Sequence, residues 1–253
     1  MDKVKSIAIT GKGGTGKTVV ATLLIRMLAE RYKNKVLAID ADSAMSLPYT
    51  LGIKAEKTVS EFRKGLLGKD QLRNELNNAP TKELMRKILY HADGFDLLTM
   101  GRPEEPGCFC AVNELLRYGI DALIDDYDVT IIDGEAGPEQ LNRRVLKSID
   151  VLLVVADMSA RSLETAAGIM EIAQRGEDGI RVNQAGLVLN RVRNDEPEEK
   201  LVKKVGLDVF GYLPEDALVN SFDREGKSLL ELPMDSACPI AMREILKKII
   251  TDF

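Results

Sequence analysis

The sequence Gly11-Lys12-Gly13-Gly14-Thr15-Gly16-Lys17-Thr18 fits the pattern G-x-x-x-x-G-K-[ST], a loop whose backbone N–H groups wrap nucleotide phosphates. In this pattern the lysine reaches the β- and γ-phosphates, and the hydroxyl residue binds Mg²⁺. A short apolar run precedes the loop at residues 6–10, and apolar residues at helical spacing follow it over residues 18–31. Strand, loop and helix in this order are the context that the motif requires, so we predict a nucleotide site here. The predicted phosphate contacts are Gly13, Gly14, Thr15, Gly16, Lys17 and Thr18.

Lys12 is a second lysine in a loop that already contains Lys17. One interpretation is an ordinary solvated lysine on the surface. The other is a cation that lies near the phosphates and completes a charge clamp, including one that reaches across a dimer interface. The residues of the loop alone leave both interpretations open.

Length and composition limit the class of protein. A chain of 253 residues suits one large α/β domain, or at most two, and we expect a single domain over residues 1–253. A net charge of −5 does not favour nucleic acid or an anionic membrane as a partner. No signal peptide and no run of about 18 apolar residues is present, so no stable membrane association is expected. Three cysteines are too few for a disulfide framework, which suits the cytoplasm.

The order of apolar runs and helical patterns predicts the fold. Residues 43–91 lose strand character and form a helical excursion, and the apolar stripe of residues 240–253 is expected to pack in the core. The pattern predicts a single-domain α/β P-loop NTPase with a mainly parallel, seven- or eight-stranded sheet and helices on both faces. We expect strands over residues 6–10, 35–39, 94–100, 127–133, 151–156, 184–190 and 207–213. We expect helices over residues 18–31, 58–67, 70–77, 81–90, 111–124, 162–175 and 240–253.

Carboxylates follow two of these strands. Asp40 and Asp42 end the strand at residues 35–39, and Asp133 ends the strand at residues 127–133. Such carboxylates point into the crevice where α/β sheets bind ligands, so they would serve Mg²⁺ and an attacking water. A simple turn cap is the alternative for the first pair. Residues Gly134-Glu135-Ala136-Gly137 offer backbone N–H groups suited to sensing a γ-phosphate.

Cys108 and Cys110 bracket one residue in an irregular segment. In an extended backbone their side chains share a face, so both sulfurs could meet one soft metal ion, and a second subunit would complete a Cys₄ site. Buried apolar cysteines, a redox pair and coincidence are the alternatives. Cys238 is expected to be an ordinary buried thiol, and His91 a surface or C-capping residue.

The combination of Lys12, Asp40-Ala41-Asp42 and Asp133–Gly137 resembles the deviant-Walker-A ATPases, the group of MinD, ParA and the nitrogenase iron protein. Within this group the chain is most similar to the CooC-type ATPases that insert nickel into carbon monoxide dehydrogenase. The likeness covers nearly the whole chain, and the C-x-C pair is its most specific element. The residues that carry it are Gly107-Cys108-Phe109-Cys110, Glu135-Ala136-Gly137, Leu141, Arg143 and Arg161-Ser162-x-Glu164-Thr165.

The resemblance implies a role for each matching residue. Lys12 would reach the nucleotide of the partner subunit, Lys17 would hold the phosphates, and Asp42 would position the hydrolytic water. Thr18 would bind Mg²⁺ directly, and Asp40 and Asp133 would lie just outside its direct ligands. Cys108 and Cys110 of both subunits would hold Ni²⁺ or Zn²⁺ at the dimer interface. The contacts on the adenine side of ATP or ADP would come from Asn190, Arg191, Pro214 and Asp216.

The chain departs from the family pattern at two positions. Ser43 replaces the usual proline after the Asp-x-Asp pair, which loosens that turn but keeps both carboxylates. Gln140 stands where histidine is expected, which suggests a paralogue and leaves the client open. The expected function is an ATP-hydrolysing homodimer that supports nickel insertion into carbon monoxide dehydrogenase or acetyl-CoA synthase. The alternatives are a MinD/ParA-type positioning protein and an iron-protein-like electron-transfer ATPase with a [4Fe–4S] cluster.

Overall fold

One sheet organises the chain. The computed structural model describes residues 4–68, 81–102, 108–137, 148–175, 181–193 and 208–250. Within them the strands follow the order β3-β4-β2-β5-β1-β6-β7-β8, and every neighbouring pair is parallel except β3 and β4. The predicted α/β fold is therefore confirmed, with eight strands. Their bounds are β1 Ser6–Gly11, β2 Val36–Ala41, β3 Tyr90–His91, β4 Phe95–Thr99, β5 Val129–Gly134, β6 Ser148–Ala156, β7 Arg181–Val192 and β8 Val209–Pro214.

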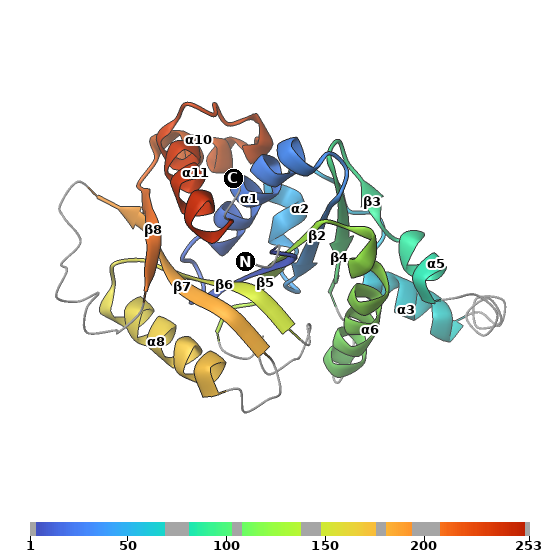
Figure 1. The fold of residues 1–253 in the computed structure, drawn as a ribbon. Helices are drawn as coiled ribbons and strands as arrows, with labels where there is room; N and C mark the ends of the chain where they lie inside the picture. The colour runs from blue at the N-terminus through green and yellow to red at the C-terminus, as the bar shows by residue number, and fades with distance from the viewer. Residues whose placement is uncertain are drawn as a thin grey trace.

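Helices cover both faces of the sheet (Figure 1). Helices α1 and α11 pack on one face, and α6 and α8 pack on the other. The bounds of the helices are α1 Lys17–Tyr32, α2 Ser46–Thr50, α3 Val59–Gly68, α5 Thr81–Arg86, α6 Cys108–Leu123, α8 Ala160–Arg175, α10 Ala217–Glu225 and α11 Ala237–Ile249. Two 3₁₀ turns, η1 Ile124–Asp126 and η2 Leu229–Glu231, complete the described elements.

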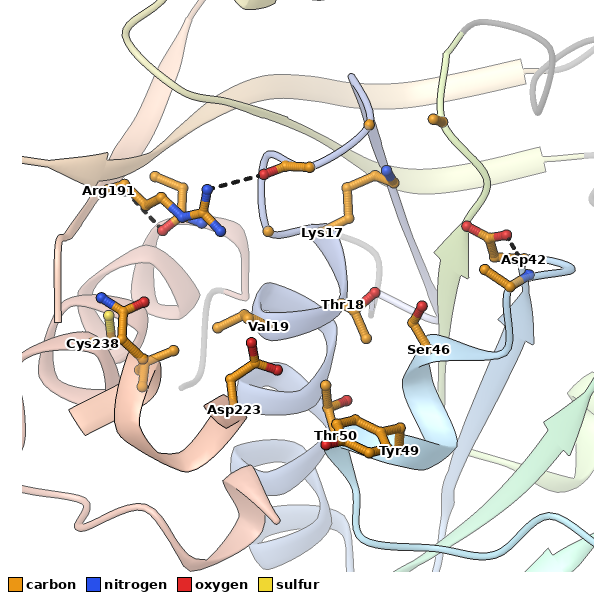
Figure 2. Close-up of a pocket in the computed structure, with 18 of the residues that line it drawn as sticks. Lys17, Thr18, Val19, Asp42, Ser46, Tyr49, Thr50, Arg191, Asp223 and Cys238 are labelled. Atoms are coloured by element: carbon orange, nitrogen blue, oxygen red, sulfur yellow. Dashed lines mark hydrogen bonds between the residues drawn. The ribbon is translucent and has the colours of Figure 1, made fainter. Parts of the chain in front are cut away.

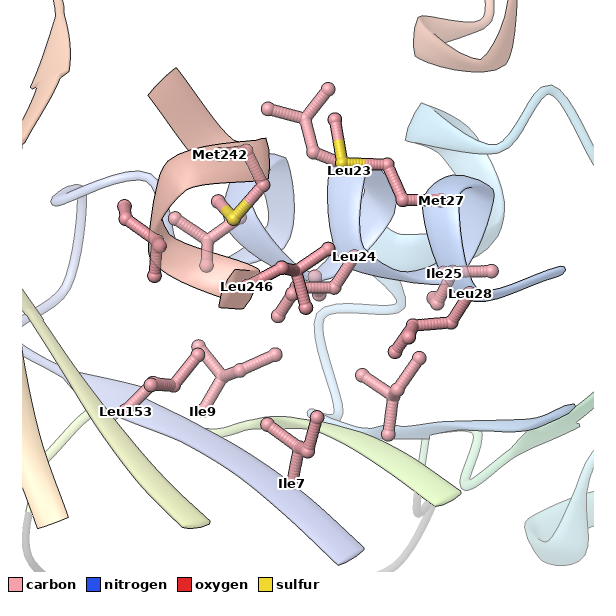
Figure 3. Close-up of a cluster of buried hydrophobic side chains, with 14 of the residues drawn as sticks. Ile7, Ile9, Leu23, Leu24, Ile25, Met27, Leu28, Leu153, Met242 and Leu246 are labelled. Atoms are coloured by element: carbon pink, nitrogen blue, oxygen red, sulfur yellow. The ribbon is translucent and has the colours of Figure 1, made fainter. Parts of the chain in front are cut away.

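Alternating side chains divide the core into two clusters, one on each face. In β6, Val151 and Leu153 contact the cluster under α1 and α11, whereas Leu152 and Val154 contact the cluster under α6 and α8. This alternation follows from the period of two along a strand, and burial on both faces explains the continuous apolar run. Figure 3 shows Leu153 below α1 and α11 on the first of these faces.

The C-terminal helix α11 uses its apolar stripe in the core, as predicted. Met242, Ile245, Leu246 and Ile249 are all buried, and Met242 and Leu246 face α1 in Figure 3. Buried side chains cannot serve as a membrane anchor without unpacking the helix. In the part of the chain that the structure describes, no helix is long and apolar enough to cross a bilayer.

The helical excursion differs from the prediction in two respects. Helix α5 ends at Arg86, and residues Tyr90–His91 form the edge strand β3 instead of continuing the helix to residue 90. The reason is a tight turn at Gly94, with φ +86°, which returns the chain as β4 and pairs His91 with Asp96. The helices α2 and α10 were not predicted, and the helix expected over residues 70–77 lies outside the described residues.

His91 lies on the surface, in strand β3 rather than at a helix C-cap. Its Nδ1 atom is 2.6 Å from Asp96 Oδ1, while Asp96 Oδ2 accepts a hydrogen bond from the Tyr127 hydroxyl at 2.5 Å. The imidazole is therefore held by a carboxylate of the neighbouring strand. This arrangement supports the sheet edge and does not contact the glycine loop.

Asp150 joins the N-terminal ends of three strands. Its Oδ2 atom accepts hydrogen bonds from the N–H groups of Lys5 and Ser6, at 2.8 and 2.9 Å, and from the Ser6 hydroxyl at 3.1 Å. Its Oδ1 atom accepts one from Asn183 Nδ2 at 2.9 Å. These donors belong to β1 and β7 or directly precede β1, so one carboxylate spans the strands on both sides of β6.

Replacing Asp150 with alanine is expected to lower the free energy of unfolding by about 2–3 kcal/mol, because it leaves partly buried donors without an acceptor. Urea denaturation monitored by circular dichroism measures the change. Asp150→Asn keeps one acceptor oxygen and should lose less than the alanine variant. Equal denaturation midpoints for the wild type and Asp150→Ala would contradict the assigned role.

Candidate functional site

The glycine loop is closed by contacts that only glycine permits. Gly11 has φ +146°, and a Cβ atom there would lie 2.1 Å from the Val155 carbonyl oxygen of β6. Gly16 has φ +92°, and a Cβ atom there would lie 2.1 Å from Asn190 Nδ2. The Thr15 hydroxyl donates to the Lys12 carbonyl oxygen at 2.9 Å and closes the loop on itself. The glycines therefore allow close packing as well as close approach to an anion.

Helix α1 begins directly after the loop and leaves its N-terminus available. No side chain caps it, and no acidic residue lies in its first turn. The N–H groups of the first turn and the positive end of the helix dipole therefore face the loop without an internal anion. This is the arrangement by which helix N-termini bind phosphates.

The end of β7 holds the loop from the other side. Asn190 Nδ2 donates to the Thr15 carbonyl oxygen at 2.7 Å, and Arg191 Nη1 donates to the Gly14 carbonyl oxygen at 3.1 Å. Arg191 adopts φ +57°, which is uncommon for a residue other than glycine. Sequence reasoning assigned these two residues to the adenine side. They line the same cavity as the loop, and their side chains also bind the loop backbone.

Asp40 and Asp133 lie side by side at the carboxyl ends of β2 and β5, where they are paired in register. Both are buried, and the atoms Asp40 Oδ2 and Asp133 Oδ1 have no hydrogen-bond partner within the described structure. Burial raises the pKa of Asp40 well above its usual range, and the neighbouring Asp133 adds to this. Burial also raises the pKa of Asp133 to about 7, although a hydrogen bond from Thr18 opposes the shift.

These orphaned oxygens form a donor set of known preference. Two carboxylates and the Thr18 hydroxyl are hard oxygen ligands, which is the chemistry that Mg²⁺ prefers in proteins. A bound cation near these residues would offset the negative charge of the two buried carboxylates and lower the repulsion between them. The residues predicted for Mg²⁺ are therefore brought together, and their chemistry fits the ion.

Lys17 is buried next to these acids. Burial lowers the pKa of its ammonium group, while the charges of Asp133, Asp42 and Glu135 act in the opposite direction. Its Nζ atom donates to the Lys12 carbonyl oxygen at 3.5 Å, which is a long contact. The ammonium group thus lies among carboxylates at one end of the cavity, where a phosphate would add a direct partner.

The segment Gly134–Gly137 rests on the glycine loop. The Gly137 N–H donates to the Gly11 carbonyl oxygen at 3.0 Å, and the Thr10 hydroxyl donates to the Gly137 carbonyl oxygen at 3.1 Å. Ala136 lines the cavity beside Gly13. The predicted switch segment is therefore in contact with the phosphate loop. Gln140, Leu141 and Arg143 lie outside the described residues.

A cavity of about 700 Å³ runs from the glycine loop to helices α10 and α11. Figure 2 shows Lys17, Thr18 and Asp42 at one end and Cys238 and Asp223 at the other. The volume suits a ligand of nucleotide size. Several wall residues carry no sequence motif and were not predicted, namely Ser46, Tyr49 and Thr50 of α2, Asp223 of α10, and Arg102.

Asp216 and Pro214 also line this cavity, but Asp216 has structural partners. Its two carboxylate oxygens accept hydrogen bonds from the N–H groups of Leu218 and Cys238, at 2.8 and 3.1 Å, and so join α10 to α11. The Cys238 thiol is buried, as predicted, and donates to the Pro214 carbonyl oxygen at 3.3 Å. Burial raises the pKa of this thiol to about 12, so it is not a nucleophile at neutral pH.

Lys12 is half-buried rather than fully solvated. Its charge acts on Asp157, in the loop after β6: burial raises the pKa of that carboxyl, but hydrogen bonds from Ser159 and the charge of Lys12 make the net shift downward. This loop is adjacent because β6 pairs with β1 up to Val155 and Gly11. Lys12 therefore lies near an acid of its own subunit at the edge of the glycine loop.

The backbone at Cys108 and Cys110 differs from the extended segment that the sequence predicted. Both residues belong to the first turn of α6, so the segment is helical and not extended. Positions two apart on a helix do not face each other, and the argument that both sulfurs share a face is therefore wrong. Their side chains lie outside the described ones. Among the residues described, no group of three or more His, Cys, Asp and Glu side chains could hold a metal ion.

Comparison with known proteins identifies the family of this chain. The model of the CobQ/CobB/MinD/ParA nucleotide binding domain matches residues 6–229. An uncharacterized ATP-binding protein of Methanocaldococcus jannaschii is 39% identical over 251 residues, covering 96% of this chain and 98% of its own. The carbon monoxide dehydrogenase accessory protein CooC of Rhodospirillum rubrum is 27% identical over 241 residues, covering 89% of each chain.

The solved structures show the same fold. The cell division ATPase MinD of Pyrococcus furiosus superposes with a TM-score of 0.72 at 24% identity, covering 97% of this chain and 98% of its own. The match extends across the sheet and the helices on both faces. With the family model spanning most of the sequence, the chain belongs to the CobQ/CobB/MinD/ParA nucleotide-binding family and is a P-loop ATPase.

Proposed function

We propose that this ATPase acts as a cytoplasmic homodimer that supports nickel insertion into a metalloenzyme, either carbon monoxide dehydrogenase or acetyl-CoA synthase. Residues 1–253 would act as one domain. The observation that carries the proposal is the position of Cys108 and Cys110 at the start of α6, shortly after Arg102, which lines the nucleotide cavity. The 27% identity to the CooC accessory protein over 89% of both chains supports it.

The residues at the glycine loop would bind and hydrolyse ATP. Lys17 and the N–H groups at the start of α1 would hold the phosphates of ATP. Thr18, Asp40 and Asp133 would hold Mg²⁺, which supplies positive charge to the phosphates when it is bound. The Asp42 Oδ1 atom accepts a hydrogen bond from the Ala44 N–H at 2.8 Å, and this carboxylate would orient the attacking water. Direct hydrolysis is favoured because no motif for an acceptor substrate is visible.

Dimerisation would connect this site to the cysteines. Lys12 from one subunit would reach the phosphates bound by its partner, and this would draw the two α6 helices together. Two pairs of cysteines would then complete a four-thiolate site for Ni²⁺ or Zn²⁺ as cargo. A position at a helix N-terminus lowers the pKa of a thiol in general, which favours the thiolate that a metal requires. Hydrolysis would reopen the site near the client enzyme.

Metal content and molar mass test this proposal. Anaerobically purified protein, with and without a non-hydrolysable ATP analogue, is expected to bind about one nickel or zinc ion per dimer. A Cys108→Ser/Cys110→Ser double variant should lose the metal, while Cys238→Ser, which removes the buried third thiol, should keep it. Equal metal content in the wild type and the double variant would overturn the shared site.

The same experiment separates the alternatives. Absorption at about 400 nm that the double variant lacks would indicate an iron–sulfur cluster and an electron-transfer ATPase. ATP-dependent binding to liposomes or DNA would indicate a positioning protein. The apolar stripe of α11 is buried in the core, so it offers no anchor for membrane attachment.

A further inference from the structure

The chain runs from the end of β4 toward the phosphate end of the cavity. Strand β4 lies beside β2 with Thr99 opposite Asp40, and the next residue, Met100, donates its N–H to the Asp40 carbonyl oxygen at 2.8 Å. Arg102 therefore follows β4 at the same edge of the sheet as Asp40 and Asp42, and Arg102 and Asp42 both line the cavity. The base end of the cavity, formed by α10 and α11, lies across the sheet beyond β1. Arg102 consequently belongs to the phosphate end.

Contacts with α3 fix the backbone at Arg102. Gly101 has φ +81°, and a Cβ atom there would lie 2.4 Å from Thr58 Oγ1, so only glycine fits. The Ser60 hydroxyl donates to the Arg102 carbonyl oxygen at 2.8 Å, and the Ser60 N–H donates to the Met100 carbonyl oxygen at 2.9 Å. The start of α3 thus holds this short segment on both sides of Gly101, and the side chain of Arg102 begins from a defined position on the cavity wall.

Among the described residues, the lack of a side-chain partner distinguishes Arg102 from the other cations of the cavity. Among the described lining residues the cations are Lys17, Arg102 and Arg191. Lys17 lies among the carboxylates, and Arg191 binds the Gly14 carbonyl oxygen. The exposed Arg102 side chain has no hydrogen bond or ion pair in the part of the chain that the structure describes. It is thus a guanidinium that no described residue engages, at the end where the most highly charged part of a nucleotide would lie.

We propose that Arg102 contacts the terminal phosphate of ATP and thereby distinguishes ATP from ADP. A guanidinium binds phosphate oxygens through paired N–H donors, and it suits a group that is present in one nucleotide and absent from the other. The inference deepens the proposed function, because Arg102 directly precedes the segment that leads to the cysteines of α6.

Binding titrations with the full chain test this assignment. Arg102→Ala is expected to weaken a non-hydrolysable Mg-ATP analogue by about 10- to 100-fold, as for loss of a charged hydrogen bond, and to change Mg-ADP affinity by less than about twofold. Arg102→Lys keeps the charge and should recover part of the loss. Lys54→Ala is the matched control, because Lys54 is 89% exposed and lies outside the cavity wall.

The outcomes separate this inference from the function on which it rests. Equal weakening of both nucleotides, or wild-type affinity for both in a variant with an unchanged thermal melt, would overturn the role of Arg102. A selective loss of the ATP analogue supports it, even in a protein that binds no nickel or zinc. The latter result would contradict the maturation function alone.

Discussion

Replacing Asp133 with asparagine is expected to slow ATP hydrolysis by about 10- to 100-fold and, at pH 8, to stabilise the nucleotide-free protein. The first effect follows because the carboxylate is one of the groups that would hold Mg²⁺, and loss of such a supporting group costs about this factor. The second follows because Asp133 is buried beside Asp40 with one oxygen unpartnered. A neutral amide of the same shape removes the cost of burying that charge.

The sign of the pH dependence tests the second effect. Burial raises the pKa of Asp133 to about 7 in the folded chain, compared with about 4 in an unfolded one. The folded state therefore binds more protons between these values, and the wild type loses stability as the pH rises from about 4 to about 7. The loss is complete about one pH unit above 7, where Asp133 is fully ionised, and it is constant from there. The stability gain of Asp133→Asn should grow across this window and then level off.

Thermal and urea unfolding at pH 5, 6, 7 and 8, without nucleotide, measure this difference. Asp125→Asn is a suitable control, because Asp125 is an exposed acid in η1 and its replacement should change neither activity nor the pH profile. Added Mg-ATP should reverse the order of stability, since the wild type gains the ion and the variant binds it poorly. A variant less stable than the wild type at pH 8 without nucleotide would contradict the buried-charge account.

Gly11→Ala is expected to destabilise the fold by about 4 kcal/mol or more and to abolish nucleotide binding. Its Cβ atom would lie 2.1 Å from the Val155 carbonyl oxygen, which is backbone of a central strand and cannot rotate away. The residue also requires φ +146°, a conformation that side chains oppose. Relief would need β1 and β6 to separate at the end that carries the glycine loop.

Gly14→Ala is the matched control for this prediction. Gly14 has φ +81°, but a Cβ atom there would meet nothing within 4 Å. Its replacement should therefore cost only the backbone strain, about 1–2 kcal/mol. Urea denaturation of the two variants in parallel distinguishes the two causes, and equal losses would show that conformation alone, without the contact to Val155, accounts for the effect at Gly11.

The sheet was predictable because its strands are buried on both faces. Runs such as residues 151–156 have a composition that fits few other elements. The glycine loop identifies the run at residues 6–10 as the strand that leads into the phosphate site. The edge strand β3 was missed because two exposed residues carry no apolar pattern. Helix α2, with five residues, is too short to show a helical period.

The residues of the site were predictable where charged side chains follow the ends of strands. They were not predictable where segments far apart in the sequence form the wall of the cavity. Asp40 and Asp133 meet because parallel strands end at the same edge. Tyr49, Arg102 and Asp223 reach the cavity from separate elements, and no spacing along the chain relates them. The backbone at the cysteines was misjudged because Pro and Gly residues before Cys108 concealed the start of a helix there.

The position of β1 in the middle of the sheet has a consequence for how the protein is made. Strand β1 is synthesised before the other strands of the sheet, yet its neighbours are β5 and β6, and Ile7 pairs with Val151. At a translation rate of about 5–20 residues per second, the emerging strand waits on the order of ten seconds for its partners. The phosphate loop therefore leaves the ribosome well before β5 and β6, the strands that hold β1 in place.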